Sequence, residues 1–316
     1  MAQPVILQMK IIYYPILGAF GIVANLMTII ILSRRKCGLS ECTSAYMVAM
    51  ATAALLVMIF SVTGYHVLSF HLMHSFFSYT GVCMLLNFVN ATCLLMAVWF
   101  TVLFTFDRYV AICCDRLKTR YCRVRIAAAV IMITTALLFL ESIPFWFAYE
   151  PEQVISHVQR GCRTKLNFFT SPLGVAFSWV HSSLVPWIPF FLIFLFNCLT
   201  IRHILVASRA RSSIRGGGSD CQRDREIESR RKSIILLFTI SGSFILLWMT
   251  SSVSFLSTGI TDTTHYRGDY TAPAYIATEI GYMLMYFSSC TNVCIYVATQ
   301  SKFRQELKRL VTFCAA

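Results

Sequence analysis

Seven long apolar segments set the strongest limit on how this chain of 316 residues can fold. Each reaches about 20 residues or more, which is enough for a helix to cross the hydrocarbon core of a bilayer. Only 13% of the residues are charged, whereas soluble domains carry about 25%. We therefore predict an all-α membrane protein with a bundle of seven transmembrane helices. The apolar segments are 11–33, 43–69, 79–106, 124–148, 175–201, 233–258 and 272–298.

The basic residues are distributed unevenly, and their distribution predicts the orientation of the bundle. Most of the 27 Lys and Arg follow the first, third, fifth and seventh segments. Because basic loops stay on the cytoplasmic side of a membrane, we expect a multi-pass protein of the plasma membrane with an extracellular N-terminus and a cytoplasmic C-terminus. The net charge of +13 then reflects topology and attraction to anionic membrane lipid, and it does not predict nucleic-acid binding.

A short amphipathic stretch follows the last segment. Phe303, Leu307 and Leu310 share one face of a helix, and basic residues flank that face. This pattern is typical of a helix that lies in the membrane interface, and Cys314 beyond it is a candidate for palmitoylation. The predicted parts of the chain are a seven-transmembrane domain, 1–298, and a cytoplasmic amphipathic helix with a short tail, 299–316.

Two of the 13 cysteines lie on the side opposite the basic loops. Cys83 begins the third segment, and Cys162 lies in the longest outer loop. Thiols on the outer side of a membrane oxidise, whereas those on the inner side stay reduced. A Cys83–Cys162 disulfide would tie this loop over the bundle; the alternative is two unrelated thiols.

The third segment ends in Asp107-Arg108-Tyr109, although the run before it, 82–106, carries no charge. A buried guanidinium is costly without a partner, so one interpretation is that Asp107 merely neutralises Arg108. The other is that the pair marks the point at which a helix leaves the membrane and performs a function there.

With the seven segments and the outer cysteine, this motif resembles the rhodopsin-like (class A) G-protein-coupled receptors over nearly the whole chain. Phe244 and Trp248 resemble the aromatic activation pair of that family, and Asn292 and Tyr296 resemble the Asn and Tyr of its Asn-Pro-x-x-Tyr motif. The resemblance implies a receptor, not an enzyme, that activates a heterotrimeric G protein, and we predict no cofactor and no metal site. The implied switch residues are Asp107, Arg108, Tyr109, Phe244, Asn292 and Tyr296.

In such a receptor, Asp107 holds Arg108 at rest. Once freed, Arg108 meets the carboxyl end of a G-protein helix, whose exposed carbonyls attract a cation. The acid of the sixth segment that often restrains Arg108 is not evident, because Arg230 stands there with Glu228 nearby. We therefore expect appreciable basal signalling.

Several positions depart from the family pattern. Ala54 and Ala97 replace residues of the usual sodium site, so we expect no such site. Thr250 and Val293 replace family prolines, which leaves open a degenerate receptor that no longer couples. Other details, such as Ser-Ile-Pro-Phe-Trp-Phe at 142–147, look most like an orphan branch that includes receptors for the aromatic amino acids tryptophan and phenylalanine.

The resemblance implies a ligand cavity between the outer halves of the helices, above Trp248. Monoamine receptors carry an aspartate where this chain has Asn90, and the aromatic-amino-acid branch carries an arginine where it has Ser251. We therefore expect an aromatic, weakly charged small molecule or a short peptide, and not an amine. The alternative for each cavity residue is a helix-packing contact. By the resemblance Trp248 closes the cavity from below, and Ser251 lies one turn above it. Helical spacing from the motifs directs the other predicted side chains to the cavity: Asn90, His181, Tyr282 and Tyr286.

Other classes of membrane protein fit the sequence less well. A transporter would show paired repeats or several midplane charges, and this chain has one set of seven segments with Glu141 alone near the midplane. An intramembrane enzyme would need a converging nucleophile and base, and the seven histidines have no such spacing. Glu141, together with Glu279 near the outer end of the seventh segment, can meet a cation; the alternative for Glu141 is a hydrogen bond to a neighbouring helix.

Overall fold

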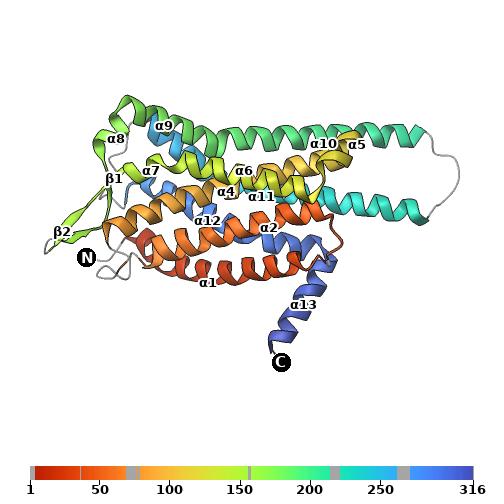
Figure 1. Cartoon of the computed structure of the whole chain (residues 1–316), viewed down its shortest axis with the longest axis horizontal. Helices are drawn as coiled ribbons and strands as arrows, with labels where there is room; N and C mark the ends of the chain where they lie inside the picture. Colours follow the sequence, from red (N-terminus) through yellow and green to blue (C-terminus); the bar gives the residue numbers. More distant parts are fainter. Residues whose placement is uncertain are drawn as a thin grey trace.

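The computed structural model describes residues 4–35, 37–68, 76, 79–155, 158–213, 221–261 and 271–315. Seven helical spans in these ranges are long and apolar enough to cross a membrane, and they form one bundle (Figure 1). The predicted seven-helix fold is therefore confirmed. The spans are Val5–Ser33, Glu41–Leu68, Thr80–Cys113, Val124–Phe147, Pro172–Ala207, Ile234–Ser254 and Pro273–Thr299.

Within the described ranges, the spans and their connections are built from α-helices, two π-helices (η1 and η3) and short strands. The helices are α1 (Val5–Ser33), α2 (Glu41–Leu56), η1 (Val57–Leu68), α4 (Thr80–Cys113), α5 (Asp115–Tyr121), α6 (Val124–Ser142), α7 (Pro144–Phe147), α8 (Leu166–Thr170), α9 (Pro172–Ser182), η3 (Ser183–Trp187), α10 (Ile188–Ser213), α11 (Cys221–Thr261), α12 (Pro273–Thr299) and α13 (Ser301–Ala315). The strands form two antiparallel pairs, β1 (Tyr149–Glu150) with β4 (Arg163–Thr164) and β2 (Gln153–Ile155) with β3 (Val158–Arg160).

Two spans begin at capping serines. The hydroxyl of Ser40, before α2, accepts a hydrogen bond from the backbone N–H of Thr43 at 3.2 Å. Ser171 caps α9 in the same way through the N–H of Gly174 at 3.1 Å, and Pro172 occupies the first turn, where its missing N–H costs nothing. These side chains satisfy N–H groups that have no partner within the helix, so they set where the second and fifth spans begin.

The fifth span contains the π-helical turn η3. The N–H of Ile188 bonds to the carbonyl of Ser183, one residue further back than in an α-helix. The next residue, Pro189, has no N–H, so the carbonyl of Leu184 loses its usual helical donors. Trp99 of α4 supplies one, with its indole Nε1 3.1 Å from that carbonyl oxygen. The turn therefore ties the fifth span to the third.

One end of the bundle carries the disulfide between Cys83 and Cys162, and we call it the disulfide end. The bond joins the first turn of α4 to the loop with the strands, and the two Cα atoms are 5.9 Å apart. Beside it, the hydroxyl of Thr80 donates to the carbonyl of Gly161 at 2.8 Å. The predicted disulfide is therefore present, and α1 begins at this same end (Figure 1).

The opposite end, which we call the Asp-Arg-Tyr end, carries residues 107–109 near the last turns of α4. There α10 and α11 extend beyond the other helices, and α13 leaves α12 at an angle (Figure 1). Phe303 and Leu310 of α13 are buried, and the ring of Phe303 lies 5.7 Å from that of Tyr296. The predicted helix after the last span is confirmed. Its place in the membrane interface and the lipidation of Cys314, whose side chain lies outside the described part of the chain, stay predictions.

Buried apolar side chains form two clusters, one in each half of the bundle. The cluster toward the Asp-Arg-Tyr end contains Tyr46, Phe104 and Tyr296. The cluster toward the disulfide end contains Trp248 and Tyr286. This packing positions two polar regions, a cavity on one side of Trp248 and a hydrogen-bonded network around residues 107 and 108.

Candidate functional site

A cavity of about 500 Å³ lies between the helices in the disulfide half of the bundle, a size suited to a drug-sized molecule. All the side chains that the sequence predicts for a ligand cavity line it. They are Asn90 of α4, His181 of α9, Trp248 and Ser251 of α11, and Tyr282 and Tyr286 of α12. The structure therefore brings the predicted residues together, and their contact with a ligand stays a prediction.

The second span also contributes to this cavity, which the spacing of residues in the sequence did not predict. Tyr65 and His66 of η1 also line it. The ring of His66 stacks on Tyr14 with centroids 4.2 Å apart, and it meets Tyr286 edge-on at 5.2 Å. A π-helix has more residues per turn than an α-helix, so α-helical spacing does not place residues of η1. The only feature of the sequence that could have indicated these two cavity residues is the adjacent Tyr and His near the end of the second apolar segment.

Aromatic and polar side chains dominate the cavity wall. Among the described residues that line it, none is Lys, Arg, Asp or Glu. Glu141 of α6 is held by His181, with its Oε1 3.0 Å from the imidazole Nδ1. Its other oxygen and Oδ1 of Asn90 are buried and have no hydrogen-bond partner among the described residues. Because Asn90 lines the cavity, its unpartnered acceptor favours a ligand that donates a hydrogen bond.

The second intramembrane acid has a different role. Glu279 of α12 lies 2.8 Å from the ammonium of Lys10 in α1. Each side chain is largely shielded from solvent, with 12% of Glu279 and 22% of Lys10 exposed. Removing one partner of such a pair leaves an uncompensated charge, so this ion pair joins the first and seventh spans and does not offer a free carboxylate to a cationic ligand.

Trp248 separates the cavity from the interior of the bundle. Its indole Nε1 donates to Oγ of Ser288 in α12 at 2.8 Å. Its ring lies 5.2 Å from that of Phe244, which lies 5.9 Å from Phe190 of α10. Because these side chains are in direct contact in a densely packed interior, a displacement of Trp248 is transmitted to α10 and α12.

A much smaller cavity of about 20 Å³ lies on the other side of Trp248, which is room for one water molecule. Asn292, one of the predicted switch residues, lines it together with Ser243. Ala54 and Ala97 line it as well, and no carboxylate is among its described lining residues. A cation there would have only neutral ligands, which is the physical reason for expecting no sodium site; that expectation stays a prediction.

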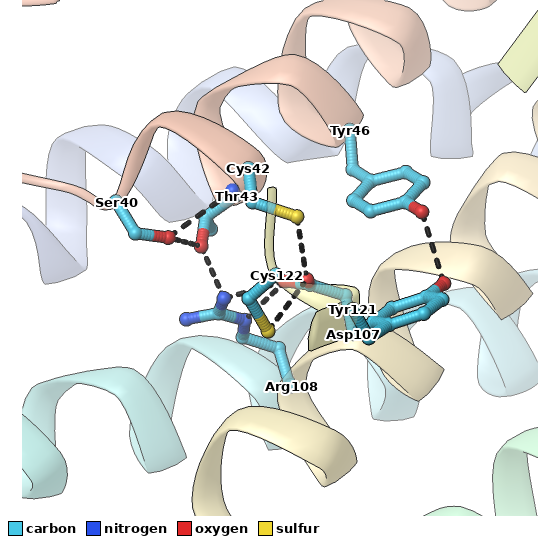
Figure 2. A network of polar contacts seen from close by, with 8 residues as sticks. All are labelled: Ser40, Cys42, Thr43, Tyr46, Asp107, Arg108, Tyr121 and Cys122. Carbon is cyan, nitrogen blue, oxygen red and sulfur yellow. Dashed lines mark hydrogen bonds and ion pairs between the residues drawn. The ribbon is translucent and has the colours of Figure 1, made fainter. Parts of the chain in front are cut away.

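At the Asp-Arg-Tyr end, Asp107 and Arg108 form a buried ion pair (Figure 2). Nε of Arg108 lies 3.0 Å from Oδ2 of Asp107, and the exposed fractions of the two residues are 8% and 0%. The guanidinium also donates to the hydroxyl of Thr43 in α2, whose oxygen lies 2.5 Å from that of Ser40. The pair is thus anchored to the capped first turn of α2, an arrangement that suits both a structural ion pair and a switch at rest.

The second oxygen of Asp107 faces two thiols (Figure 2). Sγ of Cys42 in α2 lies 3.0 Å from this Oδ1, and Sγ of Cys122, just after α5, lies 3.8 Å from it. Burial, reinforced by the neighbouring carboxylate, raises the pKa of the Cys122 thiol. The hydroxyls of Tyr46 and Tyr121 lie 3.0 Å apart. These contacts join α2, α4 and the segment after α5, and the sequence analysis did not anticipate them.

The remaining predicted switch residues lie outside this network. The ring of Tyr109 stacks on Phe196 of α10 with centroids 5.7 Å apart. Tyr296 is fully buried, and its hydroxyl has no hydrogen-bond partner within the described chain. Because a buried hydroxyl without a partner is costly, a rearrangement that supplies one would be favourable. The side chains of Glu228 and Arg230 in α11 lie outside the described part.

Comparison with known proteins identifies a family and a related protein. Residues 24–296 match the sequence model of the family described as 7 transmembrane receptor (rhodopsin family). The chain is also 23% identical to the protein named G-protein coupled receptor 39 from Homo sapiens. The alignment is 326 positions long and covers 93% of this chain and 71% of that protein.

Proposed function

Because the chain belongs to the rhodopsin family of seven-transmembrane receptors, we propose that it is a G-protein-coupled receptor for a small aromatic, weakly charged molecule or a short peptide. The ligand binds in the cavity at the disulfide end, and a heterotrimeric G protein is activated at the Asp-Arg-Tyr end. As a member of a family of receptors that are not enzymes, it works through the different affinity of the ligand for two conformations.

The ligand class is supported by what lines the cavity. Rings of Tyr65, His66, Tyr282 and Tyr286 surround a space with no Lys, Arg, Asp or Glu among its described lining residues. Aromatic faces bind aromatic ligands by stacked or edge-on contacts. The unpartnered Oδ1 of Asn90 favours a ligand with an N–H or O–H donor.

The single observation that carries the proposal is the buried pair at residues 107 and 108, at the end of the bundle opposite the cavity. At rest, Arg108 is held by Asp107 and Thr43. A ligand that displaces Trp248 shifts α10, α11 and α12, and separation of their ends frees Arg108 for the terminal carbonyls of a G-protein helix. Tyr296 then moves inward and helps to hold the gap open.

The orientation follows from the basic residues. Their excess after the odd-numbered spans supports an Asp-Arg-Tyr end in the cytoplasm and a disulfide end outside the plasma membrane. The amphipathic helix α13 contacts anionic lipid at the inner surface, and palmitoylation of Cys314 strengthens that attachment.

A receptor that no longer couples is the alternative, and Ala54, Thr250 and Val293 favour it. These residues stand where the family carries an acid and two prolines that take part in switching. A transporter is less well supported, because the chain has no paired set of repeats.

The test is second-messenger output in cells that express the chain, measured as calcium and cyclic nucleotide with and without a panel of aromatic ligands. We expect output above that of mock-transfected cells without ligand, and a further rise with an active member of the panel. Arg108→Ala should abolish both. Arg163→Ala is the matched control, because it removes an exposed arginine paired with Glu150 at the other end of the bundle.

The outcomes distinguish a coupling receptor, a receptor that no longer couples and a transporter. Output equal to mock in every pathway, with normal surface expression, would establish the non-coupling alternative. Solute uptake that does not depend on G proteins would establish transport. Equal output from Arg108→Ala and Arg163→Ala would exclude the proposed role of Arg108.

A further inference from the structure

We propose that Cys42, Asp107 and Cys122 form a binding site for one thiophilic divalent cation, with zinc as the best-suited ion. The three residues come from the first turn of α2, the last turns of α4 and the segment after α5. They are the described Cys, His, Asp or Glu residues whose potential ligand atoms gather within 4.8 Å of one another. No short sequence motif joins these positions, and the sequence alone led us to expect no metal site.

Both sulfur atoms point at the same carboxylate oxygen (Figure 2). Sγ of Cys42 is 3.0 Å from Oδ1 of Asp107, and Sγ of Cys122 is 3.8 Å from it. In a tetrahedral zinc site, Zn–S bonds of about 2.3 Å and Zn–O bonds of about 2.0 Å place sulfur and oxygen about 3.5 Å apart. The two observed distances bracket that value, so each sulfur–oxygen separation needs to change by no more than about 0.5 Å to match it.

The charges at the site balance when the metal is bound. Two thiolates and one carboxylate carry three negative charges, and zinc carries two positive charges. The guanidinium of Arg108 supplies the remaining positive charge, with Nε 3.0 Å from Oδ2 of Asp107. The metal takes Oδ1 and the guanidinium keeps Oδ2, so the two cations do not compete for one oxygen atom. A buried cluster without net charge avoids the large cost of an uncompensated ion.

The three ligands differ in burial. Cys42 and Asp107 are buried, with 1% and 0% exposed, whereas Cys122 is half-buried. Three protein ligands with a water in the fourth position are an established form of zinc coordination. Thiolates select zinc or copper(I) over magnesium and calcium, and binding releases the two thiol protons.

Bound metal would fasten the segment after α5 to α2 and α4, around the residue that holds Arg108. Zinc should therefore stabilise the resting arrangement and lower G-protein activation. This consequence rests on the proposed function, whereas the binding of the metal does not.

The binding test uses the full chain, purified, fully reduced and placed in lipid nanodiscs. Cobalt(II) is the probe, because thiolate ligands give it an intense charge-transfer band that zinc then removes. We expect one such site in the wild type, and a loss of affinity in Cys42→Ser and Cys122→Ser greater than the roughly 10- to 100-fold effect of losing an outer-shell contact. Cys198→Ser and Cys294→Ser, which alter exposed free cysteines elsewhere, are the matched controls and should bind as the wild type does.

Serine distinguishes a metal site from a structural contact. Its hydroxyl still donates a hydrogen bond to Asp107, but it is a poor zinc ligand, so the variants should fold and unfold at nearly the wild-type temperature in chelator. Zinc should raise the unfolding temperature of the wild type, as any ligand of the folded state does, and should not raise that of the variants. Identical cobalt spectra and thermal shifts in all proteins, or a Cys42–Cys122 disulfide in place of metal binding, would overturn the proposal.

A separate arm tests the consequence. Nucleotide exchange on purified G proteins is measured with the same nanodiscs at buffered zinc concentrations. Zinc should reduce exchange with the wild type and leave exchange with Cys122→Ser unchanged. If zinc binds but does not change nucleotide exchange, the proposed regulatory role is refuted and the proposed metal site stands. Absence of exchange at every zinc concentration would remove the proposed coupling together with its regulation, while the cobalt result would still decide the site.

Discussion

Replacement of Gly281 by alanine should force α11 and α12 apart. Gly281 is buried in α12, and these two helices make the most extensive contact of any helix pair in the described chain. A Cβ at this position would lie 2.8 Å from both N and Cα of Ser251, whereas non-bonded carbon atoms pack at about 3.5–4.0 Å. The opposing atoms belong to the backbone and cannot rotate away, so the helices must separate by roughly 1 Å.

The energetic effect has two parts of opposite sign. Overpacking costs about 1–3 kcal/mol, and contact with two backbone atoms places this site near the upper value. Alanine recovers up to about 1 kcal/mol through its higher helix propensity. We therefore expect Gly281→Ala to lower the free energy of unfolding by about 2 kcal/mol. Gly242→Ala in α11 is the matched control: a Cβ there meets no atom within 4 Å, so it should be neutral or stabilising.

Thermal unfolding of the purified chains in one detergent, followed by tryptophan fluorescence, measures the difference. Trp248 lies in α11 close to Ser251 and reports on the affected region. At roughly 2 °C per kcal/mol for a chain of this size, Gly281→Ala should unfold about 4 °C below the wild type. If it unfolds at the same temperature as Gly242→Ala, the close approach of α11 and α12 at Gly281 is wrong.

Two further predictions concern single hydrogen bonds. Thr43→Val removes the hydroxyl that accepts a hydrogen bond from Arg108. Because a hydrogen bond to a charged group contributes about 1.5 kcal/mol or more, ligand-free second-messenger output should rise roughly tenfold. Thr43→Ser keeps the hydroxyl, so equal output from the two variants would refute this restraint on Arg108. Ser288→Ala leaves the indole N–H of Trp248 without its acceptor and should lower the free energy of unfolding by about 1–3 kcal/mol. In a Trp248→Phe background the same change should have little effect, and thermal unfolding that shows simple additivity would contradict the contact.

The spans could be predicted because the bilayer leaves few alternatives. A backbone in hydrocarbon must satisfy its own hydrogen bonds, so an uncharged run such as 82–106 has to be a helix. The disulfide was also predictable, because Cys83 and Cys162 lie at one end of the same frame. In the same way, α-helical periodicity directs Asn90 and Tyr286 to one cavity, since residues on one face of a helix are set by spacing alone.

The exceptions have local causes that spacing does not reveal. Tyr65 and His66 reach the cavity from a π-helix, whose register differs from that of an α-helix. The bond from Trp99 to the carbonyl of Leu184 depends on the π-helical turn η3, just before α10. In both places the number of residues per turn changes within a span, and the apolar pattern of the sequence does not indicate that change.

The sequence by itself determined the seven crossings, the disulfide and the position of the Asp-Arg-Tyr motif, because each depends on the composition of one segment or on which end of a helix a residue occupies. Only the tertiary structure decided which side chains meet between helices. Cys42 and Asp107 are 65 residues apart, and Asp107 and Cys122 are 15 apart, yet both thiols reach one oxygen atom. Such meetings depend on how three elements rotate and pack against one another, and no periodicity within a single helix encodes that rotation.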